Sequence, residues 1–168
     1  MKQVERYFLE LKLPIKNKVV FNKPKNLKIT LDVDDDFKIN KFFYKIIGKD
    51  HYWKDRLIWT DKQWINYVKN PNLETWVLKY NDELVGYYEK ENHIKDNEVE
   101  LINMGILKEY RGNKYGKLIL EHLISDSLLK KYNRVWVHTC SLDHKYALKN
   151  YLARDFKIFK KEKINYVA

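Results

Sequence analysis

The sequence comprises 168 residues, of which 45% are hydrophobic and 15% aromatic, and its formal net charge is +10. This length and apolar content predict one folded domain, residues 1–168, and exclude a disordered chain. No run of about eighteen apolar residues is present, which excludes a membrane-spanning helix. The start of the chain lacks a signal-peptide pattern, and a single cysteine, Cys140, allows no internal disulfide. We therefore expect a cytoplasmic protein with no membrane partner.

The positive charge is carried mostly by lysines that are spread along the whole chain. The densest basic stretch, residues 159–163, is interrupted by Glu162. Nucleic-acid-binding proteins gather Lys and Arg into a patch or stripe, so we expect no nucleic-acid partner. The histidines occur singly, without the i,i+4 or Cys-x-x-Cys spacing of metal ligands, and predict no metal site.

Alternation of apolar and polar residues predicts strands, and a period near 3.6 predicts helices. Two strands come first, at residues 3–11 and 27–33. A helix at 36–48 follows, and Thr60 and Gln63 form a capping-box pattern that opens a second, short helix. Three antiparallel strands are predicted next, at residues 74–80, 83–90 and 98–107. A long helix at 114–131 and a strand at 134–138 follow. A final pair of strands is predicted at 157–163 and 164–167.

Residues 100–120 contain the strongest functional signal. An apolar strand ends at Leu107, a loop carries Arg111, Gly112 and Gly116, and a helical pattern begins at once. A helix N-terminus presents unpaired N–H groups and partial positive charge, and glycine lets the backbone approach an anion closely. The segment therefore predicts a phosphate-binding loop.

This loop resembles the pyrophosphate loop of the GNAT superfamily of acyl-CoA-dependent N-acyltransferases, which reads Arg/Gln-x-x-Gly-x-Gly/Ala. The sequence matches the motif at Arg111 and Gly116 and has Lys114 at the middle glycine. The resemblance implies an α/β (α+β) GNAT fold: a central mixed, mostly antiparallel, twisted sheet of about six to seven strands, flanked by about four helices.

A second match lies further along the chain. The family commonly shows Asn-x-x-Ala-x-x-x-Tyr and then Gly-Phe. Ala147, Tyr151 and Phe156 fit this pattern, whereas His144 replaces the asparagine and Asp155 replaces the glycine.

The resemblance implies acetyl-CoA as co-substrate, and the histidine spacing adds no metal. A backbone N–H that follows a bulge in the strand before the loop polarises the thioester carbonyl in this family. Asn103 to Ile106 are the candidates, and the resemblance favours Met104 and Ile106, with Gly105 marking the bulge. The residues assigned to the co-substrate are Met104, Gly105, Ile106, Arg111, Gly112, Asn113, Lys114, Tyr115, Gly116, Lys117 and His144.

Acyl transfer to an amine needs a proton acceptor for the amine and a proton donor for the departing thiolate. The resemblance implies Glu100 as the base and Tyr151 as the acid. Glu98 shares a side of the strand with Glu100, so one glutamate is the base and the other its water-linked partner, or both are solvated charges. Tyr151 alternatively only packs on the sheet. A further alternative is a covalent mechanism at Cys140 with His138 as its base.

The family builds its acceptor pocket from the first two helices and the loop between them. Aromatic side chains and an acid in this segment suit a cationic amine, although the tryptophans suit the core equally well. The residues are His51, Tyr52, Trp53, Asp55, Arg56, Trp59 and Trp64.

The predicted function is an N-acetyltransferase that modifies a primary amine of a small molecule, amino acid or peptide. Exposed sheet edges of this fold commonly pair, which makes a homodimer one option. The alternative is a non-catalytic acyl-CoA-binding or interaction module, because Lys114 and Asp155 depart from the family pattern.

Overall fold

The computed structural model of the protein describes residues 2–16, 21–34 and 36–166. Within these ranges the chain forms seven strands, four α-helices and two short 3₁₀ helices. The strands are β1 (Lys2–Lys12), β2 (Leu27–Asp32), β3 (Leu73–Tyr80), β4 (Glu83–His93), β5 (Glu98–Ile106), β6 (Arg134–Cys140) and β7 (Lys157–Tyr166). The helices are α1 (Lys38–Gly48), η1 (Lys49–His51), α2 (Asp61–Val68), η2 (Lys108–Tyr110), α3 (Tyr115–Leu129) and α4 (Ala147–Leu152).

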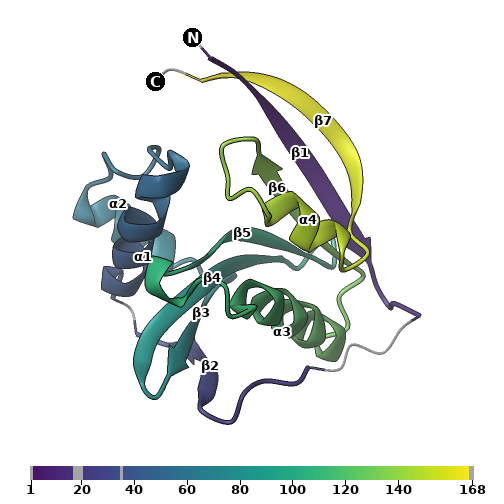
Figure 1. Cartoon of the computed structure of the whole chain (residues 1–168), viewed down its shortest axis with the longest axis horizontal. Helices are drawn as coiled ribbons and strands as arrows, with labels where there is room; N and C mark the ends of the chain where they lie inside the picture. Colours follow the sequence, from purple (N-terminus) through teal and green to yellow (C-terminus); the bar gives the residue numbers. More distant parts are fainter. Residues whose placement is uncertain (1, 17–20, 35, 167–168) are drawn as a thin grey trace.

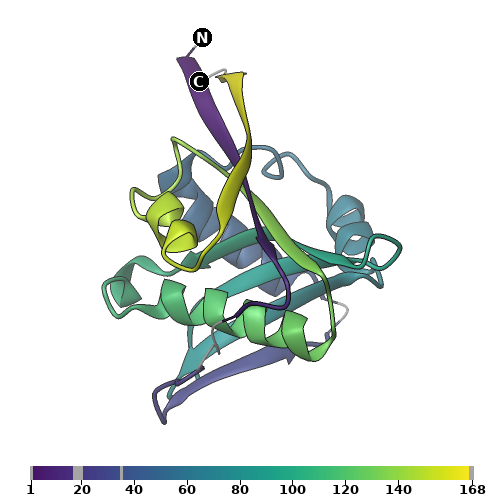
Figure 2. The ribbon, with the colours of Figure 1, turned by 90° about the vertical axis from the view of Figure 1, so that its right-hand side faces the viewer.

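All seven strands form one sheet in the order β2-β3-β4-β5-β6-β1-β7. The pair β5–β6 is parallel, and the other neighbouring strands of the described chain run antiparallel. Helices α3 and α4 cover one face of the sheet, and α1 and α2 lie on the other (Figures 1 and 2). The predicted mixed, mostly antiparallel sheet flanked by helices is therefore confirmed.

The N-terminal strand β1 lies inside the sheet, between β6 and β7. It pairs with β7 from Lys2↔Tyr166 to Glu10↔Lys157, and the two strands run side by side in Figure 1. The predicted final pair of strands is therefore wrong, because 157–166 is one continuous strand. Since β1 supplies an antiparallel partner along this length, the chain needs no turn between residues 163 and 164. Val167 lies outside the described residues.

Strand β4 extends further than predicted, to His93 rather than to residue 90. Its ladder with β5 continues through Glu91↔Glu100 to His93↔Glu98, and the turn comes at residues 94–97. The longer strand brings two polar residues of β4, Glu91 and His93, against the predicted base.

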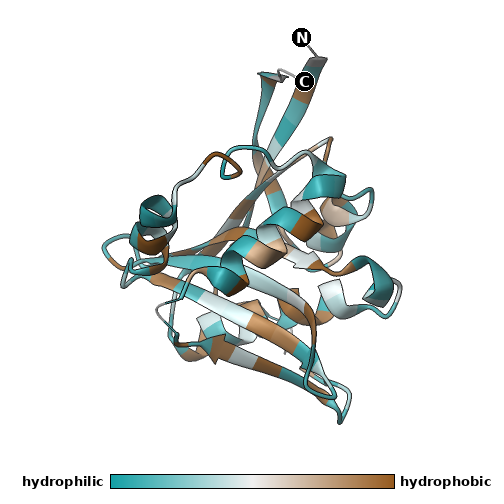
Figure 3. Ribbon diagram, turned by 90° about the vertical axis from the view of Figure 1, so that its left-hand side faces the viewer, coloured by the Kyte–Doolittle hydropathy of each residue, from teal (hydrophilic) through white to brown (hydrophobic). Residues whose placement is uncertain are grey.

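Two apolar clusters hold the helices to the sheet. Leu120, Leu123 and Ile124 of α3 lie in a cluster with residues of β1, β4, β5 and β6, while Phe43 of α1 stacks on Tyr87 with ring centroids 4.7 Å apart. Each such side chain contributes about 1.5–3 kcal/mol on burial. Hydrophobic segments gather on the strands and helices, and the connecting loops are mostly hydrophilic (Figure 3).

The short helix α2 begins as predicted. Thr60 accepts a hydrogen bond from the backbone N–H of Gln63 at 3.3 Å, and the Gln63 side chain accepts one from the Thr60 N–H, which completes the capping box. Among the described helices, none has both the length and the apolar content needed to cross a bilayer.

Candidate active site

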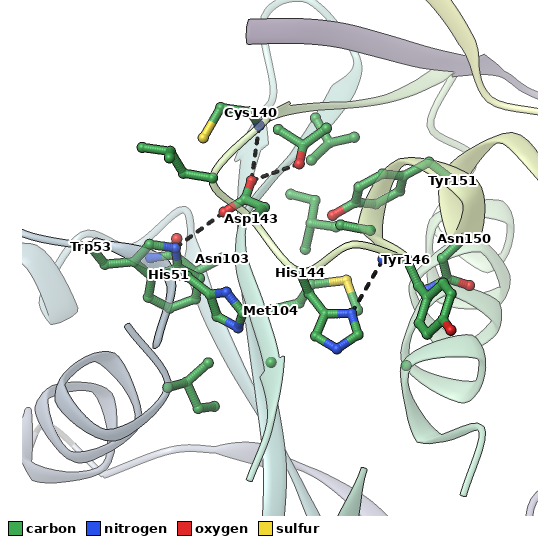
Figure 4. A pocket seen from close by; sticks show the side chains of 18 of the residues that line it. His51, Trp53, Asn103, Met104, Cys140, Asp143, His144, Tyr146, Asn150 and Tyr151 are labelled. Carbon is green, nitrogen blue, oxygen red and sulfur yellow. Dashed lines mark hydrogen bonds between the residues drawn. The ribbon is translucent and has the colours of Figure 1, made fainter. Parts of the chain in front are cut away.

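A cleft opens where strands β5 and β6 separate. Their parallel pairing runs from Glu98↔Arg134 to Leu101↔Val137, although β5 continues to Ile106 and β6 to Cys140. A cavity of about 1000 Å³ occupies this gap, at the upper end of the usual range for small-molecule sites, about 300–1,000 Å³. Its lining comes from both strands, the loop before α3, helix α4 and the segment that follows α1 (Figure 4).

A β-bulge lies at the point where the two strands part. Asn103 pairs with Glu89 and Leu101 pairs with Lys90, so Ile102 is the extra residue. The prediction that Gly105 marks the bulge is therefore wrong. A Cβ added to Gly105 would lie 2.6 Å from a methyl carbon of Ile47 on α1, so glycine is needed there for close helix packing.

The backbone of β5 beyond the bulge presents donors to the gap. The N–H of Leu107 donates to the carbonyl of Val85 on β4 at 2.9 Å. Because backbone groups of successive residues point to opposite neighbours, the N–H groups of Met104 and Ile106 face away from β4, toward the gap. The N–H and the carbonyl of one strand residue point to the same side. The Ile106 carbonyl accepts a hydrogen bond from Arg111 Nε at 3.2 Å, which is consistent with an Ile106 N–H that faces the gap.

Two positions that lack the family's glycines keep a backbone conformation typical of glycine. Lys114 has φ +62° at the N-cap of α3, and Asp155 has φ +62° before β7, both in the left-handed region. Gly112 has φ +88°. The path of the loop is therefore retained at Lys114 although the side chain differs.

The loop is held in place by two polar side chains. Arg111 pairs with Asp50 at 3.3 Å, in addition to its bond to Ile106, and so connects the loop to η1. Asn113 does not line the cleft, and its side-chain amide donates a hydrogen bond to the carbonyl of Tyr110 at 2.9 Å. Asn113 thus supports the loop through a bond within the loop itself.

The structure brings together nearly all residues predicted for the co-substrate. Of that set Asn113 does not line the cleft; those that do are Met104, Gly105, Ile106, Arg111, Gly112, Lys114, Tyr115, Gly116, Lys117 and His144. The first turn of α3, with its unpaired N–H groups, forms one wall.

Tyr151 lies on α4, and its hydroxyl points into the cleft (Figure 4). The residue is 5% exposed, and its ring packs on Phe156 with centroids 5.7 Å apart. Burial, together with the nearby Asp143, raises the pKa of the hydroxyl well above its usual value. Tyr151 therefore packs in the core and also presents a protonated donor to the cleft.

Glu100 does not line the cleft, in contrast to Tyr151. It lies opposite Glu91 in the ladder, and Asn103 lies opposite Glu89, so Glu100 shares its sheet face with Asn103, which does line the cleft. Burial raises the pKa of Glu100, and a hydrogen bond from His93 opposes this effect. The predicted base is thus a half-buried carboxyl beside the cleft.

Asp143 organises the turn between β6 and α4. Its carboxylate accepts hydrogen bonds from Thr139 Oγ1 at 2.6 Å and the Cys140 N–H at 3.0 Å, and from Trp53 Nε1 at 3.4 Å. Asp143 does not cap the following helix, because Tyr146 is the N-cap of α4. Asp143 instead connects the turn to the segment after α1.

Two histidines face each other across the cleft. The rings of His51 and His144 have centroids 5.9 Å apart, and Figure 4 shows both beside Met104. Burial and then the charge of Arg111 lower the pKa of each imidazole. His144 Nδ1 accepts a hydrogen bond from the backbone N–H of Tyr146 at 3.3 Å. This bond leaves Nε2 as the other ring nitrogen of His144.

The cysteine is poorly suited to covalent catalysis. Burial and then the charge of Asp143 raise the pKa of the Cys140 thiol, which disfavours the thiolate. Burial, and to a smaller extent the positive charge of Arg6, lowers the pKa of the His138 imidazole.

Two of the aromatic residues predicted for a cationic acceptor, Trp59 and Trp64, lie instead beside an arginine of the chain itself, together with Tyr67. The Arg56 guanidinium lies 4.2 Å from the ring centroid of Tyr67 and 5.1 Å from that of Trp59, and it pairs with Glu89 at 3.0 Å. Trp64 is buried in the core, whereas Trp53 lines the cleft. Only part of this segment is therefore available to a substrate.

Removal of the Glu89 carboxylate is expected to destabilise the fold strongly. Glu89 is fully buried and accepts hydrogen bonds from Asn40, Arg56 and Tyr67. Glu89→Ala would leave the guanidinium without its partner, at a cost of about 3–5 kcal/mol in the free energy of unfolding. Urea denaturation measures the change.

The control is Asp82→Asn, which breaks an exposed ion pair with Lys28. Such pairs contribute at most about 1 kcal/mol. Equal losses in the two variants would contradict the assignment of Glu89 to the buried network.

The structure also brings together one histidine and two glutamates, a cluster that the spacing of the histidines in the sequence did not predict. The side-chain ligand atoms of Glu91, His93 and Glu100 lie within 4.8 Å of one another. They come from two paired strands, so no local motif joins them, and only the register of β4 and β5 reveals the group. His93 and Glu91 had no place in the predicted site.

A model of the acetyltransferase (GNAT) family matches residues 29–156. The chain belongs to this family. No curated protein matches. The structure is similar to that of a GCN5-related N-acetyltransferase from Sphaerobacter thermophilus, with a TM-score of 0.70 and 12% identity over 94% of this chain. This chain spans 49% of that protein.

Two further solved structures share the GNAT fold. An aminoglycoside acetyltransferase, meta-AAC0020, from an uncultured soil metagenomic sample has a TM-score of 0.63 and 15% identity, over 85% of this chain and 95% of its own. The ribosomal-protein-S18-alanine N-acetyltransferase of Escherichia coli has a TM-score of 0.61 and 18% identity, over 78% of this chain and 77% of its own. Strand β1 precedes the residues matched by the family model.

Proposed function

We propose that this GNAT protein transfers an acetyl group from acetyl-CoA to a primary amine of a small molecule, amino acid or peptide. The observation that carries the proposal is the gap between β5 and β6, which joins the Met104 and Ile106 N–H groups, the loop at the N-terminus of α3 and the Tyr151 hydroxyl in one cleft. The names of two similar structures, an aminoglycoside and a ribosomal-protein alanine acetyltransferase, support an amine acceptor.

The cleft residues fit acetyl-CoA. Gly112 and Lys114 hold the left-handed backbone of the loop, and the first turn of α3 offers unpaired N–H groups to a pyrophosphate. Arg111, Lys114 and Lys117 line the same wall and add positive charge. Lys114 and Asp155, the two departures from the family pattern, both keep a left-handed backbone, so neither departure favours the non-catalytic alternative.

The chemistry is a direct attack of the amine nitrogen on the thioester carbonyl carbon. Glu100 accepts the proton that the amine gives up, directly or through a water. The N–H groups of Met104 and Ile106 stabilise negative charge that develops on the carbonyl oxygen. As the carbon–sulfur bond breaks, the Tyr151 hydroxyl protonates the thiolate.

The proposal is tested in two steps. Calorimetric titration with acetyl-CoA, with CoA for comparison, measures binding, and thiol release in the presence of polyamines, aminoglycosides, amino acids or peptides measures transfer. We expect 1:1 binding and release that depends on one class of amine. Binding without transfer to any amine would support the interaction module, and absence of binding at millimolar ligand would refute both readings.

Tyr151→Phe is expected to lower turnover about 10²-fold, within the usual contribution of a general acid. The phenyl ring retains the packing on Phe156, so the melting temperature and the acetyl-CoA affinity should change little. Stopped-flow thiol release measures the rate. Tyr132→Phe, three residues beyond the C-terminal end of α3, is the matched control and should remain as active as the parent. Equal rates in all three proteins would refute the acid role.

A further inference from the structure

The histidine and the two glutamates that meet across β4 and β5, called the His93 cluster below, have the dimensions of a metal site. Glu91 and His93 are two residues apart on β4, and Glu100 lies opposite Glu91 on β5, so the three side chains leave one face of the sheet. Their ligand atoms lie within 4.8 Å of one another. Ligands bound to Zn²⁺ at about 2.0–2.1 Å in a tetrahedron lie about 3.3 Å apart, so small side-chain rotations would bring all three atoms onto one ion.

The two carboxylates of the His93 cluster oppose each other without a lysine or arginine partner. Glu91 and Glu100 are directly opposite in the ladder, and like charges in this arrangement destabilise a sheet. In the described chain, Glu91 accepts a hydrogen bond from the Asn70 amide at 2.9 Å, and Glu100 contacts His93 at 2.9 Å. Arg134 of β6 is engaged by two other glutamates. The cluster is therefore negatively charged whether or not His93 is protonated, and a bound cation would neutralise it.

A tryptophan of β6 holds the imidazole and brings an unpaired donor beside it. The ring of His93 lies over that of Trp136, with centroids 6.1 Å apart and planes at 21°. Trp136 lies opposite Glu100 in the ladder of β5 and β6. Its Nε1 is buried and has no hydrogen-bond partner among the described residues. Buried donors are normally paired with protein or water, so this N–H indicates that a further polar group, such as a water held by an ion, fits beside the cluster.

The ligand atoms favour a transition metal over Mg²⁺ or Ca²⁺. The His93 cluster offers one imidazole nitrogen and two carboxylate oxygens, whereas Mg²⁺ and Ca²⁺ prefer oxygen ligands alone. Three protein ligands suit Zn²⁺ with water in the fourth position. The side chains of His93 and Glu100 are 30% and 20% exposed, so an ion can reach them from solvent.

We propose that the His93 cluster binds Zn²⁺ through His93 Nε2 and one carboxylate oxygen each from Glu91 and Glu100. The ion takes the place of the hydrogen between His93 Nε2 and Glu100 Oε2, whichever of the two atoms holds it. Binding requires no catalytic activity. Its consequence rests on the proposed function: a Glu100 carboxylate that coordinates Zn²⁺ cannot accept the proton of the amine, so Zn²⁺ inhibits acetyl transfer.

Binding is tested without a substrate. The protein is stripped with EDTA, moved to chelator-free buffer and titrated by calorimetry with ZnCl₂, CoCl₂ and MgCl₂. We expect 1:1 binding of Zn²⁺ and Co²⁺ and much weaker binding of Mg²⁺. Glu91→Gln and His93→Gln should each weaken Zn²⁺ binding by about 10²-fold or more, since loss of a residue that only orients a ligand already costs about 10–100-fold.

Glu98→Gln is the matched control. Glu98 lies opposite His93 and pairs with Arg134, so this variant removes one negative charge from the same sheet face and keeps the three ligands. It should bind Zn²⁺ within a few-fold of the parent.

Several results would overturn the site. These are absence of saturable Zn²⁺ binding, equal affinity for Zn²⁺ and Mg²⁺, parental affinity in both Glu91→Gln and His93→Gln, or loss of binding in Cys140→Ser. If the cluster variants do not fold, anomalous diffraction from a parent crystal soaked in ZnCl₂ decides. A peak between the three side chains supports the site, and a peak elsewhere or no peak refutes it.

The kinetic experiment separates this inference from the proposed function. Transfer is followed by mass spectrometry of the acetylated amine, because Zn²⁺ also binds the thiolate of CoA. Zn²⁺ should inhibit the parent, EDTA should restore it, and Glu91→Gln should remain active and lose the inhibition. A protein that binds Zn²⁺ at the His93 cluster but acetylates no amine would refute the enzyme and retain the site. An active protein that binds no Zn²⁺ would refute only the site.

Discussion

Replacement of Gly116 by aspartate is expected to weaken acetyl-CoA binding by about 10²-fold or more, the equivalent of losing two hydrogen bonds to a charged group. The added carboxylate would occupy the wall of the cleft at the N-terminus of α3 and repel a pyrophosphate. A Cβ at this position meets Asn150 Nδ2 at 3.5 Å and Met104 Cε at 3.9 Å, which are ordinary contacts. The fold should therefore tolerate the change.

Calorimetry and thermal unfolding measure the two effects separately. Gly116→Ala is the matched control, since it adds the Cβ without the charge and should retain more of the affinity. Lys114→Gly restores the family's glycine at a left-handed position and should bind with little loss. Binding of acetyl-CoA to Gly116→Asp with parental affinity, in a folded protein, would show that the ligand does not use this loop.

Glu100→Gln is expected to lower kcat/KM at pH 7 by about 10²–10⁴-fold, the usual contribution of a general base. The loss should diminish at high pH, where the acceptor amine deprotonates without help. In the parent, activity should fall with acid below a pKa that lies above the ordinary glutamate value, because burial raises the pKa of Glu100. A pH–rate profile of parent and variant with one amine measures both features.

Glu98→Gln discriminates between the two glutamates. Glu98 shares the sheet face of Glu100 but pairs with Arg134 at 2.8 Å, so its removal should cost much less activity than the loss of Glu100. A large loss in Glu98→Gln with parental activity in Glu100→Gln would exchange the two roles.

Glu100→Gln also has an expected effect on stability, which can be measured without a substrate. Because the pKa of Glu100 is higher in the folded chain than in the unfolded chain, folding favours the protonated carboxyl. Its stabilising contribution is present below the unfolded pKa and is lost as pH rises through the folded pKa. Glu100→Gln should therefore raise the melting temperature relative to the parent at pH 7 to 8, and the difference should shrink toward pH 4.

The aromatic segment shows why sequence alone left an alternative open. A tryptophan near an acid suits a bound amine and a core position equally, since both use the same apolar surface. The structure resolves this residue by residue: Trp64 is core, Trp53 borders the cleft and Trp59 lies beside Arg56. Which ring faces which cavity depends on how α1 and α2 meet the sheet.

The sequence by itself determined the features that depend on local spacing. The strand, loop and helix around Arg111 to Gly116, the capping box at Thr60 and the Ala147-to-Tyr151 spacing are written in short stretches of chain, where periodicity and turn chemistry act directly. Through the family resemblance that they carry, these features predicted the fold, Tyr151 and the residues of the loop before α3 that line the cleft.

Only the tertiary structure decided the features that depend on strand register and order. It placed β1 between β6 and β7, moved the bulge from Gly105 to Ile102, and set Glu100 beside the cleft. It also brought His93 to Glu100, across two strands joined by a turn. The physical reason is that a one-residue change of register reverses the face of every side chain, and register is fixed by the whole sheet rather than by any one strand.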